Sequence, residues 1–259
     1  MSCLNRDKIL TISGIGKSFG GLHILKNISL EVEQGERIGI IGPNGAGKTT
    51  FFNLLTGDLE PSFGEIYYRK TNISKHPNYK RARNGIVRTF QKNNLLNDLS
   101  VIDNLLLVLQ RKQGIGHIWF KQRGAKQYYE LFEKADELLD KWGLFHQRNA
   151  IVKNLSYGEQ RQIEILLGVA TEPTILLLDE PTAGMSQSET NYIVDLLYKL
   201  PKELTVMIIE HDLDIVFGLA NRMVVLFEGE ILIDGDPEVV RKDERVNKIY
   251  IGSGDEVEC

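Results

Sequence analysis

The sequence predicts an α/β fold with a strand-rich N-terminal part and a helical insertion. Three observations lead to this class. A glycine-rich loop lies between a short apolar run and an expected helix, in the order strand, loop, helix. Residues 175–178 form a continuous apolar run, as the buried strands of a parallel sheet require. Residues 92–152 change to a leucine-rich, helical composition. A chain of 259 residues with 42% hydrophobic content can form one large domain with such an insertion.

The N-terminal part is expected to consist mainly of strands. In residues 25–33, Ile28, Leu30 and Val32 alternate with polar neighbours, which is typical of a half-buried strand. Residues 37–41 are a buried strand that leads into the glycine-rich loop. Further strands are expected at residues 9–15, 65–68 and 85–90.

Residues 122–142 are expected to form an amphipathic helix. Their apolar side chains recur at spacings of three and four, and are Tyr128, Leu131, Phe132, Ala135, Leu138, Leu139 and Trp142. Such a stripe is far more often a core face than a cofactor site. We therefore interpret residues 92–152 as an inserted helical lobe, with 1–91 and 153–259 as the core of a single domain.

After the lobe, helices and strands alternate. Helices are expected at residues 157–170, 187–200 and 213–219, and strands at 174–179, 204–209, 222–227 and 230–233. Asp236 and Pro237 predict another helix start, with the aspartate as cap and the proline in the first turn.

The glycine-rich loop fits the phosphate-binding pattern G-x-x-x-x-G-K-[ST] at every fixed position. It consists of Gly42, Pro43, Asn44, Gly45, Ala46, Gly47, Lys48 and Thr49. The glycines allow backbone N–H groups to turn towards a polyphosphate, and the following helix adds its positive dipole end. Lys48 would contact the β- and γ-phosphates, and the Thr49 hydroxyl would bind Mg²⁺. A plain turn is the alternative, and the loop alone predicts only nucleoside triphosphate binding, because kinases, GTPases and motors share it.

Asp179 and Glu180 follow the apolar run of residues 175–178, at the sheet edge where ligands bind in open α/β folds. Asp179 is placed to hold Mg²⁺, and Glu180 to act as general base on a water in line with the γ-phosphate. A helix-capping acidic pair is the alternative, and the phosphate-binding loop favours catalysis. His211 ends another strand at this edge and can bond the γ-phosphate or orient the water, although a lone histidine is usually structural.

Other candidates depend more on context. Ser156 and Glu159 fit a capping box at a helix start, where the Ser156 hydroxyl and the Gly158 N–H can also bind phosphate. Gln91 ends a strand and can ligate Mg²⁺ or its water, which would sense the γ-phosphate. Phe19 can stack on a base, and a core residue at a strand end is nearly as good an interpretation.

Composition limits the remaining function classes. The net charge of −4 argues against nucleic-acid binding. Cys3 and Cys259 indicate no disulfide framework, and a reducing, cytosolic setting is favoured. No apolar run predicts a secretory signal or a membrane span, so other subunits would supply any spans. The basic residues between 69 and 88, including Arg81, are interpreted as a solvated surface, with a docking face as the alternative.

The motifs together, in the order aromatic, phosphate loop, Gln, Leu-Ser-x-Gly, Asp-Glu, His, resemble the ATP-binding cassette (ABC) family of transport ATPases over almost the whole chain. The segments 85–91, 155–161, 179–185, 209–212 and 242–252 are similar to the ATP-binding subunits of branched-chain amino-acid importers. The resemblance implies a P-loop NTPase (RecA-like) core with an N-terminal antiparallel β subdomain and an inserted α-helical subdomain.

The resemblance also implies how the protein works. ATP and Mg²⁺ would be its cofactors, with Thr50 joining Lys48 and Thr49 on the phosphates. Two ATPase subunits, identical or different, would pair head to tail, and Ser156, Gly158 and Glu159 of one would complete the other's site. Further partners would be membrane permeases, facing the segment after Gln91 with residues 115–120, and indirectly a substrate-binding protein. The chain would lie on the cytoplasmic face of the inner or plasma membrane.

Two departures from the family pattern stand out. The signature reads Leu-Ser-Tyr-Gly-Glu instead of Leu-Ser-Gly-Gly-Gln, which adds the bulk of Tyr157 and the negative charge of Glu159 beside the anion site. Ser186 stands where the family usually has an aspartate, so communication between paired sites is expected to differ.

Three other functions share part of this chemistry. The same chemistry would serve a different cargo, such as urea, amides or other amino acids, or lipopolysaccharide export. A soluble cassette ATPase acting on nucleic acid or ribosomes usually carries two cassettes or a long coiled-coil insertion, which this sequence lacks. A P-loop kinase has no use for residues 155–160 or His211.

Overall fold

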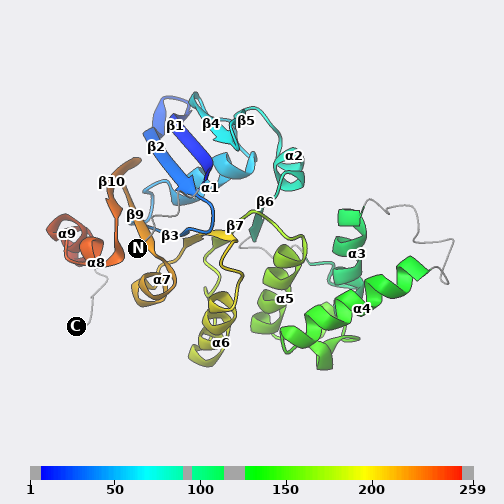
Figure 1. Cartoon of the computed structure of the whole chain (residues 1–259). Helices are drawn as coiled ribbons and strands as arrows, with labels where there is room; N and C mark the ends of the chain where they lie inside the picture. The colour runs from blue at the N-terminus through cyan, green and yellow to red at the C-terminus, as the bar shows by residue number, and fades with distance from the viewer. Residues whose placement is uncertain (1–6, 90–94, 114–125, 253–259) are drawn as a thin grey trace, which may run out of the picture.

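The computed structural model describes residues 7–89, 95–113 and 126–252. The described residues form two sheets (Figure 1). The N-terminal sheet is antiparallel, with the strand order β2-β1-β4-β5. Its strands are β1 (Lys8–Phe19), β2 (Leu22–Glu33), β4 (Phe63–Tyr68) and β5 (Thr71–Asn72). The expected antiparallel β subdomain is therefore confirmed.

The second sheet has six strands in the order β10-β9-β3-β8-β7-β6. They are β3 (Arg37–Ile41), β6 (Ile86–Thr89), β7 (Ile175–Asp179), β8 (Thr205–Ile209), β9 (Arg222–Phe227) and β10 (Glu230–Gly235). All neighbours pair in parallel except β10, which runs antiparallel to β9. The carboxyl ends of β3, β7 and β8 therefore meet at one edge.

The apolar run of β7 is explained by burial on both faces of this sheet. Ile175 and Leu177 pack in a core shared with the antiparallel sheet and α1 (Lys48–Thr56). Leu176 and Leu178 pack on the other side, with α5 (Tyr157–Ala170) and α6 (Gln187–Tyr198). Because successive side chains of a strand point to opposite faces, a strand covered on both faces needs apolar residues throughout.

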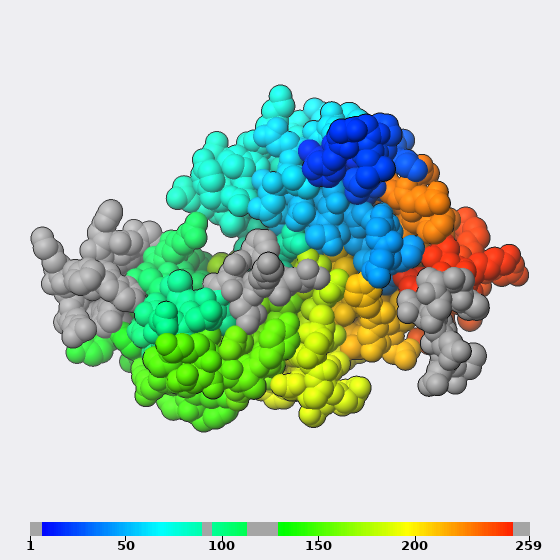
Figure 2. All heavy atoms as spheres, turned by 180° about the vertical axis from the view of Figure 1, so that it is seen from behind, coloured from blue at the N-terminus to red at the C-terminus, as the bar shows by residue number. Residues whose placement is uncertain are grey.

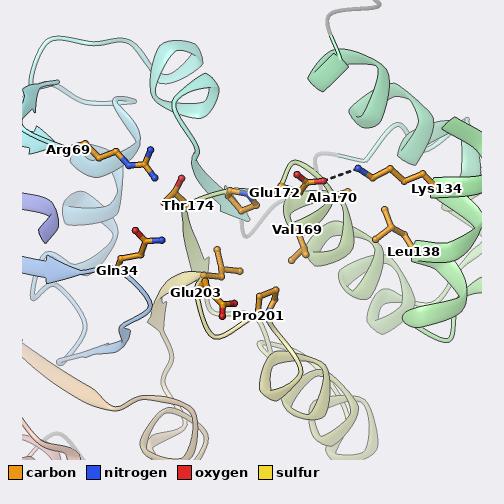
Figure 3. Close-up of a pocket in the computed structure, with 12 residues that line it drawn as sticks. Gln34, Arg69, Lys134, Leu138, Val169, Ala170, Glu172, Thr174, Pro201 and Glu203 are labelled. Carbon is orange, nitrogen blue, oxygen red and sulfur yellow. Dashed lines mark hydrogen bonds and ion pairs between the residues drawn. The ribbon is translucent and has the colours of Figure 1, made fainter. Parts of the chain in front are cut away.

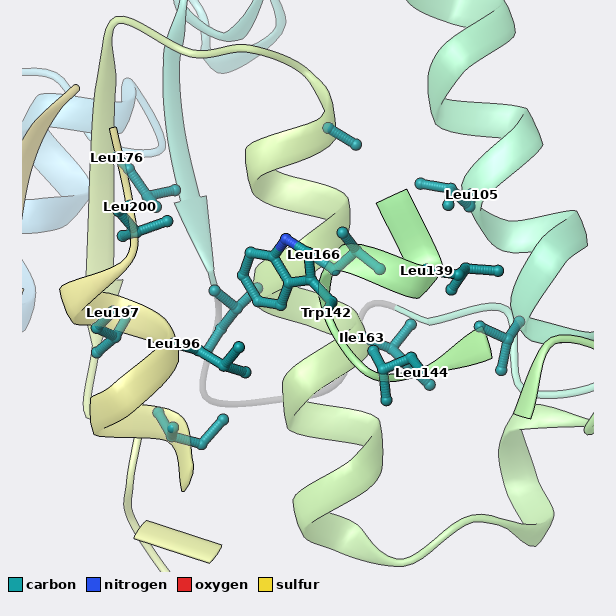
Figure 4. Packing of buried hydrophobic residues seen from close by; sticks show 14 of the residues in the cluster. Leu105, Leu139, Trp142, Leu144, Ile163, Leu166, Leu176, Leu196, Leu197 and Leu200 are labelled. Carbon is teal, nitrogen blue, oxygen red and sulfur yellow. The ribbon is translucent and has the colours of Figure 1, made fainter. Parts of the chain in front are cut away.

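The helical segment shares its core with the parallel sheet. It contains α3 (Val101–Gln113), α4 (Lys126–Lys141) and 3-10 turns at Phe145–Gln147 and Val152–Asn154. Figure 4 shows Leu105, Leu139 and Trp142 packed around residues of α5, in one cluster with Leu176. The predicted core stripe is thus confirmed for Leu131, Ala135, Leu139 and Trp142, which are buried.

The two sides of this segment meet close to its predicted boundaries. Ser100 bridges to Ile151, and the N–H of Val152 donates to the carbonyl oxygen of Leu99 at 3.0 Å. This closed base fits an insertion at residues 92–152, and that division stays a prediction.

The C-terminal helices cover the β9 side of the sheet. They are α7 (Leu213–Leu219), α8 (Pro237–Arg241) and α9 (Glu244–Gly252), and they pack with β9 in a third core cluster. Asp236 caps α8 and Pro237 opens it, as predicted. In the rear view, the blue N-terminal strands and the green helical segment lie on opposite sides of the molecule (Figure 2).

One surface assignment was wrong. Arg81, in α2 (Asn78–Arg83), is fully buried, and its guanidinium donates to the backbone oxygens of Leu54, Leu55, Ser74 and His76. Burial lowers its pKa to about 10. Arg81 therefore joins α2 to the end of α1. Within the described ranges, no helix has the length and apolar character needed to cross a bilayer.

Candidate functional site

The phosphate-binding loop connects β3 to α1 at the carboxyl edge of the sheet, where the sequence predicts it. Gly42 has a φ of 150°, and a Cβ atom there would lie 2.1 Å from the backbone oxygen of Leu226. Only glycine fits such a position. The Lys48 ammonium donates to the backbone oxygens of Gly42 and Pro43, and this side chain is only 7% exposed. Burial lowers the pKa of Lys48, while the charges of Glu180 and Asp179 oppose this shift.

The two carboxylates end β7 at the same edge. Asp179 is 1% exposed, whereas Glu180 follows the last residue of the strand. Glu180 has a φ of 47°, a conformation that non-glycine residues rarely adopt and that clusters at functional sites. Its N–H donates to the carbonyl oxygen of Ile209 in β8 at 2.8 Å, which fixes the Glu180 backbone beside the end of that strand.

His211 and Glu180 lie together, as the sequence predicts for two residues at one sheet edge. The His211 Nε2 atom is 2.9 Å from the Glu180 Oε1 atom. The His211 side chain is 52% exposed and that of Glu180 17%, so both are open to a ligand. The imidazole can thus orient the carboxylate that is proposed to act on water.

Glu210 is a buried carboxylate that the sequence interpretation missed. It accepts hydrogen bonds from the N–H and hydroxyl of Thr182, at 2.8 and 2.6 Å, and from the N–H of His211 at 3.2 Å. Burial raises the pKa of Glu210, although the Thr182 hydrogen bonds oppose this. Glu210 therefore holds the segments that carry Glu180 and His211 against each other.

Arg161 is a second missed residue. It lies in α5, is 1% exposed, and donates to the backbone oxygens of Asp179 and Pro181 at 2.7 and 3.2 Å. It also pairs with Glu164. Its place in the signature motif was a sequence signal, but the acceptors lie about twenty residues away in the chain.

Arg88 is the third missed residue, on β6. Its guanidinium pairs with the Oδ2 atom of Asp179 and also donates to the Asn53 side chain of α1. The Oδ1 atom of Asp179 is buried and has no hydrogen-bond partner in the described part of the chain. An arginine in a buried strand was the available signal, because such a charge requires a partner.

Mg²⁺ fits these residues. The cation prefers oxygen ligands and usually takes one or two from the protein and the rest from phosphate and water. Asp179 offers its unpartnered Oδ1 atom, and the exposed Thr49 offers a hydroxyl at the start of α1. Residues 7–89, 95–113 and 126–252 hold no cluster of three histidine, cysteine or acidic residues that would suit a metal held by protein alone. Gln91, the third predicted ligand, lies outside the described residues.

The N-terminus of α5 carries the predicted capping box. The Ser156 hydroxyl accepts from the N–H of Glu159 at 3.3 Å, and the Glu159 carboxylate accepts from the N–H of Ser156 at 2.8 Å. The Gln147 amide also donates to Glu159. Ser156 and Tyr157 are exposed, so this helix end is open to another molecule.

Glu189 brings a further carboxylate to this helix end. It forms a capping box with Ser186 at the start of α6. Hydrogen bonds from the Ser186 hydroxyl and backbone lower the pKa of Glu189, and the Gly158 N–H contributes in the same direction. A Cβ atom on Gly158 would lie 2.3 Å from the Glu189 Oε1 atom. Ser186, which replaces the family's aspartate, is therefore a helix cap here.

Phe19 lies at the end of β1, with its ring 48% exposed and the Lys17 ammonium 5.0 Å from the ring centroid. It pairs with Leu22 of β2, and Leu25 of the same strand contacts Gly47. The core interpretation of Phe19 was therefore wrong, and an exposed ring at the end of β1 is available for a base.

A cavity of about 370 Å³ lies elsewhere (Figure 3). Gln34, Thr174 and Glu203 line it, and these residues precede β3, β7 and β8. The cavity is therefore at the amino ends of the strands, opposite the phosphate-binding loop, and is not the nucleotide site.

The fold, together with the residues at the carboxyl edge of the parallel sheet, defines a P-loop ATPase of the cassette type. The family model described as ABC transporter matches residues 25–183, and the chain belongs to this family and is an ATPase. It is 38% identical over 249 residues to the high-affinity branched-chain amino acid transport ATP-binding protein LivG of Salmonella typhimurium, covering 94% of this chain and 98% of that protein. It is 39% identical over 249 residues to the high-affinity branched-chain amino acid transport ATP-binding protein BraF of Pseudomonas aeruginosa, covering 94% of this chain and 98% of that protein.

Solved structures agree with this assignment. The ADP conformation of MJ1267, an ATP-binding cassette of an ABC transporter, superposes with a TM-score of 0.81 at 32% identity, covering 95% of this chain and 99% of that one. A dimeric post-hydrolysis state of the cassette MJ0796, bound to ADP and Pi, gives 0.74 at 28% identity, covering 88% and 99%. The predicted fold, ATPase activity and family are thereby confirmed.

Proposed function

We propose that the chain is the ATP-hydrolysing subunit of an uptake transporter for branched-chain amino acids. It would lie on the cytoplasmic face of the membrane and drive integral permease subunits, with a substrate-binding protein delivering the cargo. The similarity to LivG and BraF covers 94% of this chain, and their names, which state branched-chain amino acid transport and ATP binding, support the cargo class.

ATP would bind across the phosphate-binding loop. The loop N–H groups and the N-terminus of α1 would surround the phosphates, with Lys48 leaving the backbone oxygens of Gly42 and Pro43 to reach the β- and γ-phosphates. Thr50 would add a hydroxyl, and Phe19 would stack on the base. Residues 43–46 supply the turn.

Thr49, Asp179 and Gln91 would hold Mg²⁺, directly or through water. The cation would neutralise charge on the β- and γ-phosphate oxygens. Asp179 suits this role because its Oδ1 atom is buried at the sheet edge without a partner in the described structure.

Hydrolysis would depend on Glu180 and His211. Glu180 would polarise the attacking water, and His211, 2.9 Å away, would orient that carboxylate and bond the γ-phosphate. Gln91 would respond to the presence of the γ-phosphate. This is catalysis by positioning and electrostatics.

The observation that carries the proposed pairing is the exposed N-terminus of α5. Ser156 is exposed there and Gly158 is buried beside Glu189, and both carry groups suited to phosphate, while Lys48, Asp179 and Glu180 belong to another part of the chain. A second ATPase subunit docked head to tail would bring Ser156, Gly158 and Glu159 to the first subunit's ATP. The dimeric cassette structures with TM-scores of 0.74 support this arrangement.

A groove between α2 and α3 supports permease docking. It has a volume of about 670 Å³ and is lined by Tyr79, Val108, Arg83 and Arg111 among others. An exposed aromatic ring and basic side chains beside an apolar wall suit a short amphipathic segment of a partner.

The variant Glu180→Gln tests the chemistry. We expect ATP binding to persist and turnover to fall by about 10²- to 10⁴-fold, because the general base is lost. ATP should also hold the variant as a pair, measured by light scattering after chromatography. Turnover at the parent rate would contradict the assignment of Glu180.

The cargo is tested by isolating the tagged chain from membranes and identifying the proteins that accompany it. We expect two permeases, a second ATPase and a binding protein, and stimulation of the reconstituted ATPase by leucine, isoleucine or valine. Stimulation by urea or an amide alone would assign a different cargo, and recovery with ribosomes would contradict the transport role.

A further inference from the structure

Arg88 joins three elements of the nucleotide site. It lies on β6 next to Leu177 of β7, and its side chain is 5% exposed. One terminal nitrogen pairs with the Oδ2 atom of Asp179, and the other donates to the Oδ1 atom of Asn53 on α1. A buried charge is costly unless it is paired, so both acceptors contribute to holding the guanidinium in place.

Through Asn53, Arg88 also reaches the start of α1. Thr49 and Asn53 are four residues apart on this helix and share one face. Arg88 thus bonds directly to Asp179, and it is linked to Thr49 through Asn53, which lies one helical turn further along α1. The ring of Phe52, 5.7 Å from the guanidinium carbon, further restricts the arginine side chain.

The ion pair also distinguishes the two oxygens of Asp179. Arg88 takes Oδ2, and Oδ1 is the buried oxygen without a partner in the described ranges. A carboxylate bonded through one oxygen to a rigid planar guanidinium cannot rotate freely about its terminal bond. The orientation of Oδ1 is therefore set by Arg88.

We propose that Arg88 is a positioning residue for the metal site: it holds Asp179 and the Thr49 face of α1 in the geometry that receives Mg²⁺ together with ATP. This inference depends on the proposed role of Asp179 as a Mg²⁺ ligand. It assigns to Arg88 a role in the Mg²⁺ dependence of nucleotide binding, separate from nucleotide binding itself.

The experiment compares the affinity for a fluorescent ATP analogue with Mg²⁺ and with EDTA. We define the Mg²⁺ gain as the Kd in EDTA divided by the Kd with Mg²⁺. In Arg88→Met we expect the Mg²⁺ gain to fall about 10-fold, while the Kd in EDTA stays within about threefold, because the phosphate-binding loop is unchanged. Arg88→Lys keeps the charge but lacks the planar fork, so we expect a loss of about threefold.

Asn53→Ala provides a second route to the same result. It removes one acceptor of Arg88 without touching the buried ion pair, so the variant should fold even if Arg88→Met does not. We expect its Mg²⁺ gain to fall about threefold. Arg81→Met is the matched control, because Arg81 is also buried and donates to the backbone oxygens of Leu54 and Leu55 at the end of α1, so its loss disturbs the same helix without removing a bond to Asp179 or to the Asn53 side chain. Its Mg²⁺ gain should equal that of the parent, even if its thermal stability falls.

The outcomes separate this inference from the metal site itself. Loss of the Mg²⁺ gain in Asp179→Asn supports the proposed ligand, and an unchanged gain there overturns the ligand and the inference together. If Asp179→Asn loses the gain but Arg88→Lys and Asn53→Ala keep it, only the inference is overturned. A larger Mg²⁺ gain in the Arg88 variants would overturn it too, since Arg88 would then act only by charge repulsion.

Discussion

The N-termini of α1 and α5 are both proposed to bind phosphate, yet they differ in how side chains of the same chain cap them. Before α1 stands Gly47, in a left-handed conformation with no capping side chain, and the first turn contains no acidic residue. Before α5 stands Ser156 in a complete capping box, Glu159 lies in the first turn, and the carboxylate of Glu189 lies at Gly158. The first helix leaves its N–H groups to a ligand, whereas the second already binds its own side chains.

This difference in capping indicates which half of the site can bind nucleotide without a partner. The α1 side combines a helix N-terminus without a side-chain cap with a buried lysine, so we expect one chain to be sufficient to bind nucleotide. The α5 side has its own anions next to the place proposed for a partner's phosphate. It can contribute only when a phosphate oxygen competes with carboxylates already present.

The largest expected effect is that of Lys48→Ala. It removes the ammonium at the α1 side, and we expect nucleotide binding to weaken by at least about 10²-fold, since charge-assisted bonds to phosphate are lost. A titration with a fluorescent ATP analogue measures this. Unchanged affinity would contradict the role of the loop, and the N-termini of α1 and α5 would then not differ in nucleotide binding.

Gly158→Ala should affect pairing and turnover, whereas Lys48→Ala affects nucleotide binding. A Cβ atom on Gly158 would lie 2.3 Å from the Glu189 Oε1 atom, so the Glu189 side chain has to move away from this helix end, and we expect ATP-dependent pairing and turnover to fall about 10-fold or more. Nucleotide binding by the single chain should persist. Gly168→Ala in the same helix is the control, because its Cβ would meet no atom closer than 3.4 Å. Equal losses in both variants would mean that general damage to α5 is responsible.

Ser156→Ala tests the cap itself. We expect the free energy of unfolding to fall by about 1 kcal/mol, because the N–H of Glu159 loses its acceptor. Chemical denaturation of the ATP-free chain measures this. Ser156→Thr, which keeps the hydroxyl, should recover most of it. If alanine costs nothing, the capping box does not stabilise α5.

The smallest expected effect is a pH dependence at the other end of α5, beyond its C-terminus. Glu172, beyond the end of α5, pairs with Lys112 and Lys134 of α3 and α4, and their hydrogen bonds lower its pKa to about 2. Because this folded pKa is below the ordinary value, the stabilisation is complete above about pH 4.5 and is lost as the pH falls towards 2. Glu172 is 61% exposed, so we expect less than about 1 kcal/mol. The unfolding free energies of the parent and Glu172→Gln should converge between pH 4.5 and 2, and a constant difference would contradict this.

Local patterns in the sequence were enough for much of this structure. The phosphate-binding loop, the Ser156 capping box and the stripe of Leu131, Ala135 and Leu139 depend on neighbours within a few residues. Asp179 and His211 were placed at one edge because parallel strands align their carboxyl ends.

Contacts between distant segments could not be predicted in the same way. The Arg88 pairing with Asp179 requires the register of β6 on β7, and the burial of Arg81 requires the end of α1 to lie beside α2. The short elements β5 and α2 lack enough residues for a clear period. Glu189 reaches Gly158 only because α5 and α6 begin side by side.

Arg161 has a mechanical consequence. It lies five residues after Ser156 in α5 and grips the backbone oxygens of Asp179, Glu180 and Pro181, at 2.7, 3.3 and 3.2 Å. A partner's triphosphate bound at the N-terminus of α5, as proposed, would therefore be connected through Arg161 to the backbone of Glu180, the proposed general base. In the proposed head-to-tail pair, α5 of each subunit would thus connect the partner's ATP with the ATP bound by its own chain.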